Sequence, residues 1–485
     1  MQGEFFTSLL DVEFMLSLCD VINSPLVQVE PAARLVYYNL IFHGGVLGGP
    51  RSQITARGLY LQCLHAVPAW QACASGTMLD LIASSLMTFT TAISFDYTLA
   101  WKFHRQACEF VKQRGLDRLN ALDMVGLTKT EIDNQRLGFW QLVLVDIFFR
   151  FFANKPSSIS SEASVASSGV PPATDVTHQR PRAGRTIVNT IWQRVLFVAK
   201  EFFEHYDRVS IIDGGTKSHQ FQKKVDSLCD EIEEMIDDWQ LTLLMESYAK
   251  KPMDSWLCAD TIVGTLNILL EMDKLRQSGA EPMVSERSKR AARLILDTTI
   301  NFDEMLRNSS KPHGALYMYC IAFYPFRAFF SLYYHILKCD DPADCEQDVL
   351  RLDKIGTVMV RAAQSRFEWI PIAKAIVSLN QVTKFMQQRQ DMSSTTPWED
   401  AWPERSNSGH LLSIEQAHMA DSVSRGLPLV LQQPEFAQWL PDHEGMHFST
   451  AADFQHAAAQ PDFRPIEYMQ AIEEQFAERG WNYGW

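Results

Sequence analysis

Apolar residues recur at intervals of three and four along most of the chain, and this spacing limits the possible folds more than any other feature. Between residues 96 and 114 they mark a single helix face. The alternating runs and two-residue turns of β-hairpins are weak throughout. We therefore expect an all-α, large multi-helix domain. The same spacing predicts further helices at residues 8–20, 31–45, 54–67, 77–94, 129–153, 186–207, 219–249, 254–277, 284–307, 314–338, 346–367, 369–389 and 413–432.

Two segments interrupt the predicted helices. Residues 154–185 are rich in Ser, Ala, Pro and Gly, which is typical of a flexible loop. Residues 390–412 form a second, partly ordered connector, because Trp398 and Trp402 provide large apolar surfaces that favour docking on the helical body. The expected organisation is one helical half at 1–153, a second at 186–389, and C-terminal helices with an acidic tail at 413–485.

Charge and cysteine usage exclude several kinds of function. The net charge of −14 repels phosphate backbones, so we expect no direct nucleic-acid binding by this chain. The nine cysteines include no CxxC pair, which argues against a structural zinc module and a thioredoxin-type redox site. Scattered through apolar stretches in odd number, they are typical of reduced, buried thiols. We accordingly expect no cofactor, no bound metal and no membrane association.

Charged residues stand in the otherwise apolar stretch at 129–153. Charges in such a setting are costly unless they are paired, so they indicate a specific buried polar network. Asp146 and Arg150 are four residues apart, in the order that favours an ion pair on one helix face. Arg136 precedes Trp140 by one turn and is placed to stack on its ring. We interpret these residues as structural.

Helix ends can be assigned around the same stretch. Asp96 and Thr128 have the side chains that accept hydrogen bonds from the first backbone N–H groups of a helix. Gly115 follows the helix that ends at Arg114 and is the residue type that stops a helix in a left-handed conformation. The sequence thus predicts a helix, a tight turn and a second helix.

The residues of this region resemble the middle homology region of fungal zinc-binuclear-cluster transcription regulators. Two positions depart from the family pattern, since Gln135 replaces the first of two adjacent arginines and Asn154-Lys155 replaces Gly-Arg before the proline. The six-cysteine zinc cluster of the family is absent, so we expect that the chain begins inside the regulatory domain. The resemblance extends over most of the chain, with sharp matches only at about 96–160. The matching positions are Gly115, Leu116, Arg118, Glu131, Arg136, Trp140, Asp146, Arg150 and Pro156.

The resemblance implies a transcription regulator of a secondary-metabolite gene cluster, located in the nucleus. It would act through a DNA-binding regulator or a homodimer partner, and such regulators can also take a small-molecule effector. The alternative is a biosynthetic enzyme that has recruited the same fold and uses an interhelical pocket, with candidates among Arg136, Asp146 and His104. Fold resemblance alone does not decide between these two.

One further motif suggests metal chemistry. His443-Glu444-Gly445-Met446-His447 matches HExxH, in which two histidines one helical turn apart bind zinc and the glutamate acts as a base. Pro441 and Gly445 oppose a stable helix here, and no third ligand is fixed by the sequence. We expect a chance match.

Overall fold

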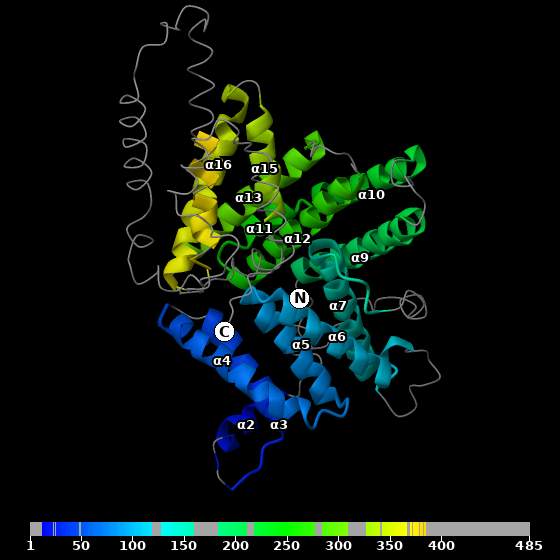
Figure 1. The fold of residues 1–485 in the computed structure, drawn as a ribbon, viewed down its shortest axis with the longest axis vertical. Helices are drawn as coiled ribbons and strands as arrows, with labels where there is room; N and C mark the ends of the chain where they lie inside the picture. Colours follow the sequence, from blue (N-terminus) through cyan, green and yellow to red (C-terminus); the bar gives the residue numbers. More distant parts are fainter. Residues whose placement is uncertain are drawn as a thin grey trace, which may run out of the picture. The chain divides into compact units, whose positions relative to one another are not determined.

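The computed structural model describes residues 12–118 except 23, 25 and 48–49, then 128–159, 183–210, 218–276, 284–308, 326–339, 342–365, 369–370, 372–377, 379–381 and 383–384. These residues are helical and include no strand, so the all-α prediction is confirmed (Figure 1). The predicted helix at 413–432, the connector at 390–412 and the His443–Glu444–His447 match lie outside the described residues.

The chain divides into two compact units, with the main boundary near residue 280. Helices of the first unit are α2 (Val12–Val21), α3 (Pro31–Leu47), α4 (Pro50–Gln71), α5 (Met78–Ile93), α6 (Tyr97–Gln113), η1 (Leu116–Arg118), α7 (Lys129–Ala153), α9 (Ala183–Ser210), α10 (His219–Asp238), α11 (Leu241–Ser247) and α12 (Pro252–Arg276). The second unit contains residues 286–300 of α13 (Glu286–Arg307), with α15 (Arg327–Lys338), α16 (Pro342–Ser365) and the described part of 369–384.

In the first unit, helices that follow one another along the chain pack together. α3 packs on α4 and α5, α5 packs on α6, and α6 packs on α7 (Figure 1). Farther along the chain, α12 contacts α9, α10 and α11. Buried polar side chains join these helices, since Trp70 donates a hydrogen bond to Asp80 at 2.8 Å and Thr90 donates to Asn39 at 2.5 Å. Within the described residues, no helix is both long and apolar enough to span a bilayer.

The predicted helix ends are confirmed. The Asp96 carboxylate accepts the Leu99 N–H at 3.0 Å, and α6 gives way to Gly115 at φ +66°. Thr128 caps α7 and forms a reciprocal capping box with Glu131. The prediction of one helix at 219–249 is wrong, because Gln240 adopts a left-handed conformation (φ 46°) that separates α10 from α11.

Candidate functional site

Asp146 of α7 is buried at the centre of a group of polar residues. His104 of α6 places Nε2 3.0 Å from Asp146 Oδ1. After α7 ends at Asn154 in a left-handed conformation, the chain turns back, so that the Ser157 hydroxyl donates to Asp146 Oδ2 at 2.6 Å and the Ser158 N–H donates to Oδ1 at 2.9 Å. His104 is 0% exposed and Asp146 is 3% exposed. We call His104, Cys108, Asp146, Ser157 and Ser158 the Asp146 cluster.

The hydrogen bonds of the Asp146 cluster stabilise a carboxylate. Burial alone raises the pKa of Asp146, but the hydrogen bond and positive charge of His104, with the donors of Ser157 and Ser158, outweigh it and leave the pKa below its usual value. An ionised carboxylate only accepts hydrogen bonds, so His104 Nε2 carries the proton that it donates to Asp146. One carboxylate therefore holds together α6, α7 and the segment that follows α7.

Cys108 adds a thiol to this cluster but not a nucleophile. Its Sγ lies 3.4 Å from the same His104 Nε2 that contacts Asp146. In a nucleophilic triad, the thiol and the carboxylate contact opposite ring nitrogens, so that the histidine can take the thiol proton. Burial and the nearby charge of Asp146 also raise the pKa of Cys108, which is only 1% exposed. The arrangement suits a structural tie better than covalent catalysis.

Arg150 faces a different helix from Asp146. Its Nη2 donates to both carboxylate oxygens of Asp207 on α9, at 2.9 Å each, and its guanidinium carbon lies 3.6 Å from the centre of the Phe203 ring. The predicted ion pair between Asp146 and Arg150 is therefore wrong. The four-residue spacing places both side chains on one side of α7. However, His104 of α6 is the nearer partner of Asp146, and Asp207 of α9 is the nearer partner of Arg150.

Arg136 and Trp140 also differ from the prediction. Arg136 is partly exposed, and the described contacts of Trp140 are with the rings of Phe139 and Phe197, whose centres lie 6.1 and 6.2 Å away. The proposed stacking of Arg136 on Trp140 is not among the contacts of the described residues. Arg136 also takes no part in the Asp146 cluster, whereas His104 and Asp146, the other two enzyme candidates, lie in it together.

The remaining positions of the resemblance shape the backbone around α7. Gly115 begins the turn, Leu116 is buried in η1 at 7% exposure, and Glu131 completes the capping box. Arg118 ends η1, and Pro156 is exposed between α7 and Ser157. These positions form caps, turns and packing contacts. Ser157, Ser158 and Asp207 carry key contacts that we did not predict, because their partners are distant in sequence or lie in an expected loop.

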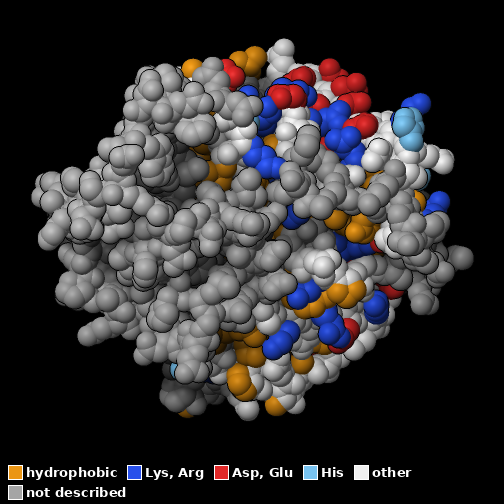
Figure 2. All heavy atoms as spheres, turned by 45° about the horizontal axis from the view of Figure 1, so that its top comes forward, with side chains coloured by type: hydrophobic (Ala, Val, Ile, Leu, Met, Phe, Trp, Pro, Cys, Tyr) orange, Lys and Arg blue, Asp and Glu red, His pale blue; other side chains and the backbone are white. Residues whose placement is uncertain are grey.

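Charges on the described surface are mixed. Figure 2 shows Lys and Arg side chains lying among Asp and Glu side chains on the described part of one face. Several cations are paired within their unit, as Lys224 is with Glu201 and Arg276 with Asp226 and Asp273. The described part of this face thus has no uniform basic stripe of the kind that follows a nucleic-acid backbone.

No protein-family model, curated protein or solved structure matches this chain. The likeness to fungal regulators therefore rests on the sequence itself, with sharp matches only at about 96–160, and stays a prediction.

Proposed function

We propose that the chain is a helical regulatory module that controls the expression of a gene set, as the regulators of fungal secondary-metabolite clusters do. The observation that best supports this proposal is that both carboxylate oxygens of Asp146 accept hydrogen bonds from within the fold. The donors come from α6 and from the segment after α7, so both oxygens are used within the fold. The residues that most resemble the family therefore favour a scaffold for protein contacts over a catalytic site.

The proposed module acts through a protein partner. With a net charge of −14 and no CxxC pair, the sequence offers neither a basic surface nor a zinc cluster for gripping DNA. A DNA-binding regulator or a second copy of the chain would supply that contact in the nucleus. A small-molecule effector remains part of the proposal, because interhelical sites are common places for such ligands.

Gene deletion separates the regulator from the alternative enzyme. For a regulator, deletion lowers the transcripts of a set of neighbouring biosynthetic genes, measured by RNA sequencing. For an enzyme, those transcripts stay at their normal level while a pathway intermediate accumulates, measured by mass spectrometry of extracts. Normal transcripts in the deletion strain would contradict our proposal.

Two matched arginine variants connect this test to the structure. Arg150 ties α7 to α9, whereas Arg105 of α6 forms an exposed pair with Glu109, with both side chains 59% exposed. Reintroducing Arg150→Ala should restore fewer transcripts than the wild-type gene, and Arg105→Ala should restore them fully. Immunoblots of both variants give the amount of protein, so that a loss of folded protein is separated from a loss of partner contact.

A further inference from the structure

Two cysteines and a histidine meet at the junction of α15 and α16 in the second unit. His335 lies in the last turn of α15, Cys339 is the residue that ends this helix, and Cys345 lies in the first turn of α16. One ligand atom from each residue lies within 4.8 Å of the others. Cys345 is buried, while Cys339 and His335 are partly exposed, with 16% of the His335 side chain accessible. An ion can therefore reach this group from solvent.

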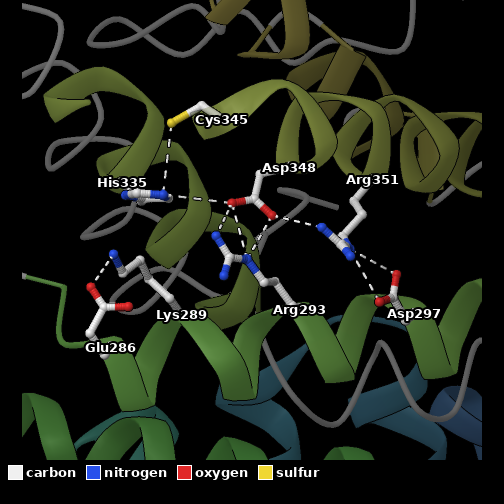
Figure 3. A network of polar contacts seen from close by, with 8 residues as sticks. All are labelled: Glu286, Lys289, Arg293, Asp297, His335, Cys345, Asp348 and Arg351. Carbon is white, nitrogen blue, oxygen red and sulfur yellow. Dashed lines mark hydrogen bonds and ion pairs between the residues drawn. The ribbon is translucent and has the colours of Figure 1, made fainter. Parts of the chain in front are cut away.

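The separations suit a tetrahedral metal better than an unmediated contact. His335 Nε2 lies 3.7 Å from Cys345 Sγ, toward the long end of the range for a hydrogen bond to sulfur (Figure 3). Zn–N bonds of about 2.05 Å and Zn–S bonds of about 2.3 Å at a tetrahedral angle place the two donor atoms about 3.6 Å apart. These two donor atoms are therefore already close to the separation that a shared tetrahedral zinc ion requires.

An ion-pair network fixes α16, the helix that carries Cys345. Arg293 of α13 donates to both oxygens of Asp348 on α16, at 2.9 and 2.7 Å, and Arg351 donates to Asp348 at 3.0 Å (Figure 3). Asp348 Oδ2 in turn lies 3.7 Å from His335 Nε2. The carboxylate is 1% exposed, so this network holds α16 against α13 from a buried position beside the imidazole.

Zinc binds cysteine as the thiolate and histidine as the neutral imidazole, so binding at this group would release the two thiol protons to solvent. A divalent cation replaces the thiol protons and balances the two negative charges that result.

We propose that His335, Cys339 and Cys345 bind one Zn²⁺ ion, with solvent in the fourth tetrahedral position. Two thiolates and an imidazole match the preference of zinc for sulfur and nitrogen, whereas Mg²⁺ and Ca²⁺ prefer oxygen. Three protein ligands with partial exposure are typical of a zinc site that can accept a further ligand. This site is independent of the proposed regulatory function, because its residues lie outside the Asp146 cluster.

Cobalt binding to the full chain tests the proposal. The reduced protein is freed of metal with a chelator and titrated with Co²⁺, which gives a thiolate-to-cobalt absorption band in the near ultraviolet. We expect one equivalent to bind and one equivalent of Zn²⁺ to remove the band. Cys345→Ser and His335→Ala should each weaken binding by more than the about 10–100-fold loss that follows removal of an outer-shell contact.

Two control variants identify the site. Cys73→Ser removes an exposed thiol of the first unit and should leave binding unchanged. The double variant His443→Ala, His447→Ala should also leave it unchanged, and if that variant abolished binding, the HExxH match would be the true site. The proposal is overturned if the wild-type chain shows no thiolate band, if Cys345→Ser binds like the wild type, or if mass spectrometry of anaerobically purified protein finds a Cys339–Cys345 disulfide. Circular dichroism confirms that each variant is folded.

Discussion

The two units each contain a cluster with histidine and cysteine, and the clusters differ in how closely their donor atoms approach one another and in how exposed they are. In the Asp146 cluster, His104 Nε2 lies 3.0 Å from a carboxylate oxygen and 3.4 Å from Cys108 Sγ, and the three residues are at most 3% exposed. In the second unit, the corresponding nitrogen and sulfur are 3.7 Å apart, and the histidine is partly exposed. The same residue types therefore form a structural tie in one place and a candidate metal site in the other.

This difference shows that residue types alone do not define a metal site. Asp146 accepts donors from Ser157 and Ser158, so a metal there would have to displace hydrogen bonds that stabilise the fold. At the α15–α16 junction, His335 Nε2 and Cys345 Sγ lie 3.7 Å apart, and the carboxylate of Asp348 is held by Arg293 and Arg351. The separation of the donor atoms and their exposure decide between the two outcomes.

The largest effect is expected from removing Asp146. Asp146→Ala leaves His104, the Ser157 hydroxyl and the Ser158 N–H without their acceptor, so we expect the free energy of unfolding to fall by about 3–5 kcal/mol. Urea unfolding followed by circular dichroism measures it. Glu109→Ala on the exposed side of α6 is the control and should change stability by less than about 0.5 kcal/mol. An equally small effect of Asp146→Ala would show that this cluster is not a structural tie.

Removal of metal should affect the second cluster only. Zinc at about 100 times its dissociation constant stabilises a protein that binds it only when folded by about 2.7 kcal/mol, so a chelator should lower the melting temperature of the wild-type chain. Cys345→Ser should melt at the same temperature with and without the chelator. Cys108→Ser, which alters the first cluster, should still respond to it. A response that depended on Cys108 would reverse our assignment of the two clusters.

Acid should weaken the Asp146 tie in a defined range. The folded-state pKa of Asp146 lies below the value of about 3.9 in an unfolded chain, so the folded protein binds this proton less readily. The stabilisation is therefore complete above about pH 4 and is lost as the pH falls through the folded pKa. The stability difference between the wild type and Asp146→Asn should shrink as the pH falls below about 4. A constant difference at all pH values would show that Asp146 is not ionised in the fold.

Local sequence rules predicted the helices well but not the contacts between them. The caps at Asp96 and Thr128 and the stop at Gly115 follow from side chains within three residues of the backbone groups that they satisfy. Asp146 and Arg150 are different, because their partners lie 42 and 57 residues away in the chain. Charges in an apolar helix indicated buried pairs, and only the packing of α6, α7 and α9 could determine which pairs form.

The junction of α15 and α16 escaped prediction for a related reason. A search for CxxC pairs finds ligands that share one tight turn, whereas His335, Cys339 and Cys345 come from the end of one helix and the start of the next. The spacing of four residues between His335 and Cys339 was a usable signal, because it places both side chains on one face of a helix. Cys345 becomes a neighbour only when α16 begins beside that face.

The smallest predicted effect comes from a helix cap that belongs to neither cluster, and it tests whether the two clusters are independent. Thr128 caps α7, the helix that carries Asp146, and its hydroxyl accepts the Glu131 N–H at 3.3 Å. Thr128→Ala should lower the free energy of unfolding by about 1 kcal/mol, and Thr128→Ser should recover most of it, because serine caps a helix equally well. Cobalt affinity should be the same in both variants, since the metal ligands lie in the other unit. A change in cobalt affinity with Thr128→Ala would mean that the two clusters are energetically coupled and do not act as independent sites.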